Sequence, residues 1–246
     1  MSTRLPRRSV LSLLALLGTV CSASARIIRG GRAFERARTP PPVQVDHFAP
    51  WGFLTDDEGV AVEAIVDRLI PPDGEGPGGR DAGCAVFIDR QLAGDYGRSI
   101  TWYLAGPSAV GTPQQGPQHT DTIADCYRAG LAALDQYCRG RFDGRRFAAL
   151  TPEMQDSVLA AMEHGKAELG VIDSRAFFQR LLGNTRQGYL ADPAYGGNRN
   201  MAGWRLIGFP GARYDYRPFL GRPGEDLALD PVSLFGTESR SLGKEL

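Results

Sequence analysis

Histidine and cysteine are the residues of this chain with the most obvious capacity for catalysis or metal binding, and their spacing favours neither. The three histidines, His47, His119 and His164, lie far apart, and no C-x-x-C or H-x-x-x-H pair marks a metal site. There is no G-x-S-x-G nucleophile motif and no P-loop, and no G-x-G-x-x-G follows an expected strand. We therefore expect no catalytic residues and no metal site in this chain.

The cysteines could form a disulfide. Cys126 and Cys138 are expected on one helix, about 18 Å apart at about 1.5 Å per residue, whereas a disulfide joins Cα atoms about 4.4 to 6.8 Å apart. An intrachain disulfide must therefore join Cys84 to Cys126 or to Cys138, and both pairings stay open. Because three cysteines follow residue 25, one thiol is left free or pairs with a partner chain.

The N-terminus predicts export from the cytoplasm. Arg7 and Arg8 precede an apolar run from Val10 to Val20 and the cleavage pattern Ala23-Ser24-Ala25. An apolar run of about eleven residues is too short to span a bilayer, which needs about 20. We predict a twin-arginine signal peptide over residues 1–25 and a periplasmic protein. Lipidation of Cys21 is a weaker alternative, because a branched residue precedes it.

The remaining chain predicts an all-α domain. A proline-rich linker or arm over residues 26–50 precedes a helical domain over residues 51–224 and a C-terminal tail over residues 225–246. Caps and apolar spacing predict helices that begin near residues 56, 84, 123, 152 and 174. The fold class is therefore an irregular bundle of five or six helices with long loops rich in glycine and proline. Without the three arginines of the signal, acidic residues slightly outnumber basic ones, so we expect no nucleic-acid partner.

The segment from Asp192 to Gly211 is the most unusual part of the sequence, and we call it the glycine-aromatic segment. It combines glycines with two prolines and the aromatic residues Tyr195, Trp204 and Phe209. Glycine allows close backbone approach, and aromatic rings dominate many binding surfaces. A loop that only covers the helical core fits the composition equally well. The residues predicted to contact a partner are Asp192, Tyr195, Gly196, Gly197, Asn198, Trp204, Phe209 and Pro210, with Tyr195 and Trp204 as anchors.

Three stretches resemble the subunit 3 (small or gamma subunit) family of gluconate 2-dehydrogenase. They are Asp67-Arg68-Leu69-Ile70-Pro71 with Phe87-Ile88-Asp89, Tyr127-Arg128-Ala129-Gly130-Leu131, and the glycine-aromatic segment. The resemblance implies a complex in which a separate FAD-dependent large subunit oxidises a sugar or sugar acid and a multihaem cytochrome c subunit receives the electrons. It further implies that this chain binds no cofactor, helps to export the flavoprotein, and reaches the membrane only through the complex.

A second class of function stays open on the sequence alone. The chain could be a free-standing periplasmic enzyme or a sugar-binding protein that uses the glycine-aromatic segment together with Asp73, Glu75 and Asp81. Copurification of a large flavoprotein from the periplasm would separate this class from the subunit.

Overall fold

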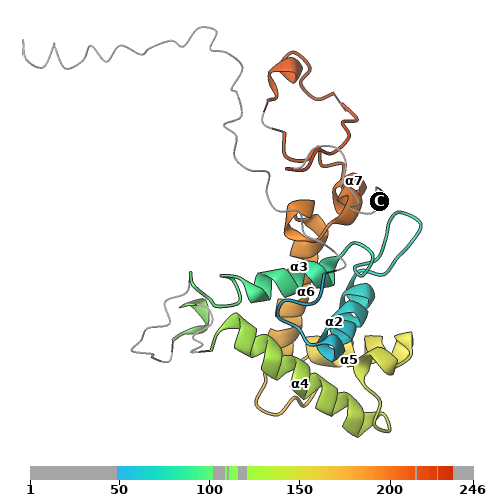
Figure 1. The fold of residues 1–246 in the computed structure, drawn as a ribbon, viewed down its shortest axis with the longest axis vertical. Coiled ribbons are helices and arrows are strands. Elements are labelled where there is room, and N and C mark those ends of the chain that lie inside the picture. The colour runs from blue at the N-terminus through green and yellow to red at the C-terminus, as the bar shows by residue number, and fades with distance from the viewer. Residues whose placement is uncertain are drawn as a thin grey trace, which may run out of the picture. The chain divides into compact units, whose positions relative to one another are not determined.

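The computed structural model describes residues 49–101, 109, 111–115, 121–213, 215–225 and 227–234, all within one compact unit. These residues form six α-helices and no strand, which confirms the predicted all-α fold (Figure 1). Two isolated bridges, Leu169 with Ile172 and Gly211 with Val232, are the only β-type pairings among them. The α-helices are α2 (Asp56–Leu69), α3 (Cys84–Ala93), α4 (Ile123–Arg141), α5 (Pro152–Glu163), α6 (Ser174–Leu190) and α7 (Ala202–Leu206).

Side-chain caps fix where three of the long helices start. Thr55 and Glu58 form a reciprocal capping box at α2, as the sequence predicts, and Thr122 and Asp125 form another at α4. The Asp173 side chain accepts a hydrogen bond from the backbone N–H of Ala176 at α6. Each cap uses residues within three positions of the helix start, which is why the starts could be predicted from the sequence.

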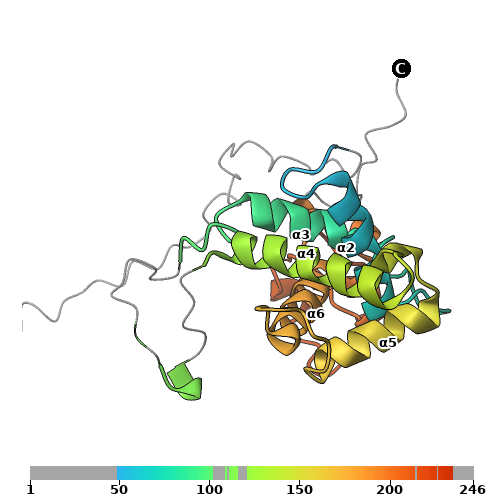
Figure 2. The same ribbon diagram turned by 90° about the horizontal axis from the view of Figure 1, so that it is seen from below.

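Helix α6 is the centre of the bundle, and α2, α3, α4 and α5 all pack against it (Figures 1 and 2). Its contact with α4 is close: a Cβ atom on Gly130 would lie 2.6 Å from the ring of Phe177. The Asn184 side chain donates to the Tyr127 hydroxyl at 2.8 Å and accepts from the Tyr96 hydroxyl at 2.9 Å. The buried Asn184 side chain on α6 is therefore hydrogen-bonded by α4 and by the turn after α3.

Several predictions concern residues outside the described ranges. The signal peptide with Arg7, Arg8 and Cys21 lies there, as does the linker or arm up to residue 48. None of the helices in the described ranges is both long enough and apolar enough to span a bilayer.

Candidate functional site

The glycine-aromatic segment begins where α6 ends and folds into short helical turns. It contains the 3-10 helices η3 (Pro193–Tyr195) and η4 (Arg199–Met201), followed by α7. The Asp192 carboxylate caps η3 by accepting the N–H of Ala194 at 2.9 Å, and it also accepts the N–H of Leu234 at 2.9 Å. Asp192 therefore joins the start of the segment to the last described residue of the chain.

Two glycines allow the segment to lie directly on the end of α6. A Cβ atom on Gly197 would lie 2.0 Å from the carbonyl oxygen of Gly188, and one on Gly203 would lie 2.0 Å from the carbonyl oxygen of Tyr189. Because a side chain at either position would collide with backbone, the close approach requires glycine. These glycines therefore allow close backbone approach, as predicted, but the surface that they approach is α6 of this same chain.

Asn198 and Trp204 hold the segment in place from inside. Asn198 is fully buried, donates to the carbonyl of Ala191 at 2.8 Å and accepts the N–H of Gly203 at 2.8 Å. The indole N–H of Trp204 donates to the carbonyl of Leu190 at 2.7 Å, and its ring packs edge-to-face on Phe209 with centroids 5.1 Å apart. With 5% of its surface exposed, Trp204 is buried, so this predicted anchor lies inside the folded segment and does not face solvent.

The apolar side chains that do face solvent differ in part from the predicted set. Tyr195 is 52% exposed and Phe209 is 42% exposed, as a partner contact requires. Ile207 is 58% exposed, although it is not among the predicted contact residues. A helix of five residues is too short to show apolar periodicity, so its solvent-facing side could not be predicted. We call the exposed apolar side chains on and beside the segment the apolar set: Leu190, Tyr195, Leu206, Ile207 and Phe209.

A groove of about 570 Å³ lies beside the segment. Leu190 and Tyr195 of the apolar set line it together with Phe87 of α3. Arg186 and Asp192 add one charge of each sign. The groove thus combines apolar walls with charged side chains.

Described residues of the predicted C-terminal tail, Asp230, Val232 and Leu234, contact the glycine-aromatic segment. Val232 pairs with Gly211, and the N–H of Ala212 donates to the Val232 carbonyl at 2.6 Å. Ser233 is buried. Pro210 and Gly196, which were also predicted to contact a partner, take part in this local structure. The Pro210 carbonyl accepts a hydrogen bond from the N–H of Val232, and Gly196 ends η3 with a φ of 97°.

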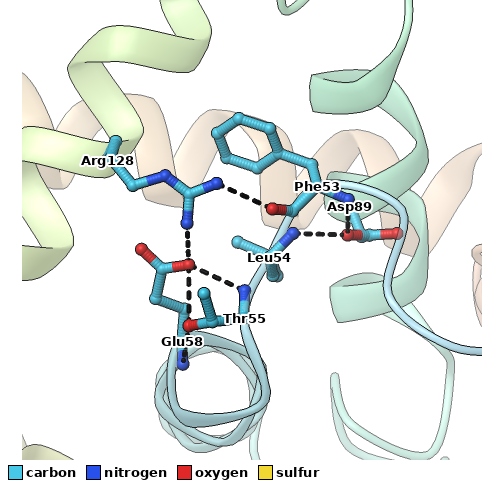
Figure 3. Close-up of polar contacts among 6 residues, drawn as sticks. All are labelled: Phe53, Leu54, Thr55, Glu58, Asp89 and Arg128. Atoms are coloured by element: carbon cyan, nitrogen blue, oxygen red, sulfur yellow. Dashed lines mark hydrogen bonds and ion pairs between the residues drawn. The ribbon is translucent and has the colours of Figure 1, made fainter.

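Asp89 and Arg128 come from the other two stretches that resemble the family. Both bind the backbone that precedes α2, at the N-terminal end of the described domain (Figure 3). The buried Asp89 carboxylate accepts the N–H groups of Gly52, Phe53 and Leu54 at 2.8, 2.9 and 2.9 Å. Arg128 pairs with Glu58, donates to the Phe53 carbonyl at 2.7 Å and lies over the Phe53 ring, 4.2 Å from its centroid. Asp89 and Arg128 therefore have a structural role in positioning residues 52–54.

The predicted disulfide is absent, because Cys84, Cys126 and Cys138 are all free thiols in the structure. Cys84 begins α3 and Cys138 lies near the end of α4, and each is packed into the core. Burial raises the pKa of both thiols to about 12, so both are neutral and unreactive at pH 7. Burial also raises the pKa of Cys126, which is partly exposed.

A second cavity, of about 400 Å³, lies between α2, α4 and the 3-10 helix η2 (Phe147–Ala149). Arg146 stands at this cavity and is already paired with Asp57 at 2.5 Å and with Asp135 at 3.7 Å. Its charge is therefore compensated within the chain. Asp73 is one of the three acidic residues considered for a sugar-binding site. Its carboxylate already accepts hydrogen bonds from the N–H groups of Glu75 and Gly76 in a turn.

The described residues define the class of protein, an all-α domain with a glycine-rich segment packed on its central helix. Residues 56–211 match the family described as gluconate 2-dehydrogenase subunit 3. The chain belongs to this family. No curated protein and no solved structure matches it.

Proposed function

We propose that this chain is the non-catalytic small subunit of a periplasmic, FAD-dependent complex of the gluconate 2-dehydrogenase type. In this proposal the FAD belongs to a large dehydrogenase subunit and haem c to a cytochrome subunit. The small subunit assists export and assembly of the flavoprotein, and it associates with the membrane through the complex. Membership of the subunit 3 family, whose name is that of a component of a larger enzyme, supports the proposal.

The observation that carries the proposal is the apolar set, held on a rigid part of the chain. Ile207 and Tyr195 are more than half exposed, while the backbone beneath them is fixed by Asn198 and by close glycine contacts. Exposed apolar groups gain free energy when a partner covers them, at about 25 cal/mol per Å² of apolar surface. Because the segment is ordered before binding, little conformational entropy is lost on association. A rigid surface with exposed apolar side chains is suited to a permanent protein partner.

The export part of the proposal comes from Arg7 and Arg8. The twin-arginine route carries folded proteins, so a flavoprotein that has already bound its FAD can cross the membrane while attached to this chain. In that scheme the association forms in the cytoplasm and persists in the periplasm, as a stable apolar contact allows.

Copurification of the dehydrogenase subunit with variants of the full chain tests the proposal. Ile207→Asp places a charge in the apolar set and should abolish copurification, while Tyr195→Ala should weaken binding about thirtyfold, as loss of about 2 kcal/mol implies. Neither change should lower the melting temperature of the isolated subunit, since both side chains are more than half exposed. Val171→Asp is the matched control, because Val171 is fully exposed in the loop before α6.

Two results would contradict the proposal. Undisturbed copurification of both variants would overturn the proposed docking surface. Failure of the wild-type chain to bind any dehydrogenase subunit would overturn the proposed function itself.

A further inference from the structure

The groove of about 570 Å³ beside the glycine-aromatic segment is formed by two helices that pack against each other, α3 and α6 (Figure 1). Phe87 and Gln91 of α3 are four residues apart, as are Arg186 and Leu190 of α6, so each pair lies on one face of its helix. Tyr195 of η3 also lines the groove. Because Leu190 and Tyr195 belong to the apolar set, the groove is continuous with the proposed docking surface.

Arg186 brings to this groove a positive charge that the described part of the chain does not pair. It is an exposed residue, and no carboxylate in the described ranges forms an ion pair with it. Arg205, by contrast, pairs with Asp230 at 3.2 Å. Helix α6 itself offers no partner, since Ser174–Leu190 contains three arginines and no acidic residue. The charge of Arg186 is therefore available to a group on another molecule.

The other polar side chains of the groove also favour a negatively charged acceptor. Asp192 is the one acidic residue that lines it, and its two carboxylate oxygens already accept the N–H groups of Ala194 and Leu234, each at 2.9 Å. The side-chain amides of Gln91 and Gln187 have no hydrogen-bond partner among the described residues. Two amides and one guanidinium group can thus donate hydrogen bonds, whereas the one carboxylate is occupied by backbone donors.

We infer that this groove binds a carboxylate side chain of the dehydrogenase subunit, with Arg186 as the charged anchor and the apolar walls covered by apolar side chains that flank the carboxylate. The inference rests on the proposed function, since the dehydrogenase subunit supplies the carboxylate. A guanidinium group suits this task because it can bind both oxygens of a carboxylate at once. Charge complementarity at Arg186 provides specificity, and burial of Leu190 and Tyr195 provides free energy of association.

The test measures the affinity of the full chain for the purified dehydrogenase subunit. Arg186→Gln removes the charge but keeps most of the side-chain stem, and it should weaken binding about tenfold or more. Arg186→Glu should weaken binding further by repelling the carboxylate, while Arg186→Lys should retain part of the affinity. The melting temperature of the isolated subunit should be unchanged in all three variants, because Arg186 is exposed and forms no ion pair with the described residues.

Arg175→Gln is the matched control. Arg175 is also exposed and has no ion pair among the described residues, and it lies on the same face of α6 about three turns and about 17 Å before Arg186. It does not line the groove. Arg175→Gln should therefore bind within about threefold of wild type, well under one factor of ten in affinity.

Three results would overturn the inference. Wild-type affinity in Arg186→Gln would remove Arg186 from the interface, and an equal loss in Arg175→Gln would mean that any positive charge on α6 serves as well. Sodium gluconate at millimolar concentration, added to the isolated wild-type subunit, tests a free sugar acid as the source of the carboxylate. A rise in melting temperature with gluconate that is lost in Arg186→Gln would overturn the partner assignment.

The same measurements separate the inference from the proposed function. A wild-type chain that binds no dehydrogenase subunit would overturn both together. Equal binding by wild type and Arg186→Gln would overturn the inference alone.

Discussion

Replacement of Asp89 by asparagine should destabilise the helical domain by about 3 kcal/mol. The Asp89 carboxylate has no solvent exposure and accepts three backbone N–H groups within 2.9 Å, those of Gly52, Phe53 and Leu54. An asparagine oxygen in the position of Oδ1 still accepts two of these N–H groups. The new amide NH₂ then faces the N–H of Gly52 and the Arg90 guanidinium, which lies 3.4 Å from Oδ2 of Asp89, so a charge-assisted hydrogen bond and an ion pair are replaced by opposed donors.

The magnitude follows from those contacts. A hydrogen bond to a charged group contributes about 1.5–3 kcal/mol, and a buried donor left without an acceptor costs about 1–3 kcal/mol. For a domain of about 150 to 250 residues, each kcal/mol changes the melting temperature by about 2–4 °C, so a fall of about 6–12 °C is expected.

Thermal unfolding followed by circular dichroism measures this change directly. Asp95→Asn is the matched control, because the Asp95 side chain is 71% exposed and its one ion pair among the described residues is with Arg98 at the surface. Its melting temperature should stay within about 2 °C of wild type, as surface pairs contribute about 0–1 kcal/mol. Equal melting temperatures for the two variants would refute the role assigned to Asp89.

The other predictions concern thiols, backbone packing and export. Alkylation of the native chain at pH 8 should modify Cys126 before the two buried thiols. Because burial raises the pKa of Cys84 to about 12 from an ordinary 9.0, only the unfolded state ionises at that thiol between those values. The free energy of unfolding should therefore fall as pH rises above about 9, and less steeply in Cys84→Ala, as urea titrations at several pH values can test. Gly203→Ala should lower the melting temperature by several degrees, because its Cβ would lie 2.0 Å from a carbonyl oxygen; unchanged melting would contradict the close approach. Arg7→Lys combined with Arg8→Lys should retain this chain and the flavoprotein in the cytoplasm, and normal periplasmic levels of both on fractionation would refute shared export.

The parts of the fold that could be predicted from the sequence are those governed by neighbouring residues. Thr55 and Asp173 cap helices through bonds to residues three positions away, so the sequence displays the whole interaction. Asp89 binds N–H groups 35 to 37 residues away, and no local pattern reveals such a contact. Its place in a family stretch indicated importance without indicating the role.

The glycine-aromatic segment could be recognised from its composition, but which of its aromatic side chains are buried could not be predicted. Tyr195 and Trp204 look alike in the sequence as aromatic residues beside glycine. Their exposure differs tenfold, 52% against 5%, because the carbonyl of Leu190 at the end of α6 accepts the indole N–H. The three thiols are free in the structure, and their arrangement was not predictable for a related reason: helical spacing excludes a pair on one helix, but it does not show whether cysteines on two helices meet.

Site-specific photo-crosslinking in the periplasm tests the central claim, that the glycine-aromatic segment contacts the dehydrogenase subunit. A benzophenone amino acid would replace Ile207, which is 58% exposed, and in a separate strain Val171, which is fully exposed. The two positions lie beyond opposite ends of α6, whose 17 residues span about 25 Å at about 1.5 Å per residue. We expect irradiation to join the dehydrogenase subunit to the chain from position 207 and not from position 171. No crosslink from position 207, or equal crosslinking from both, would contradict the claim.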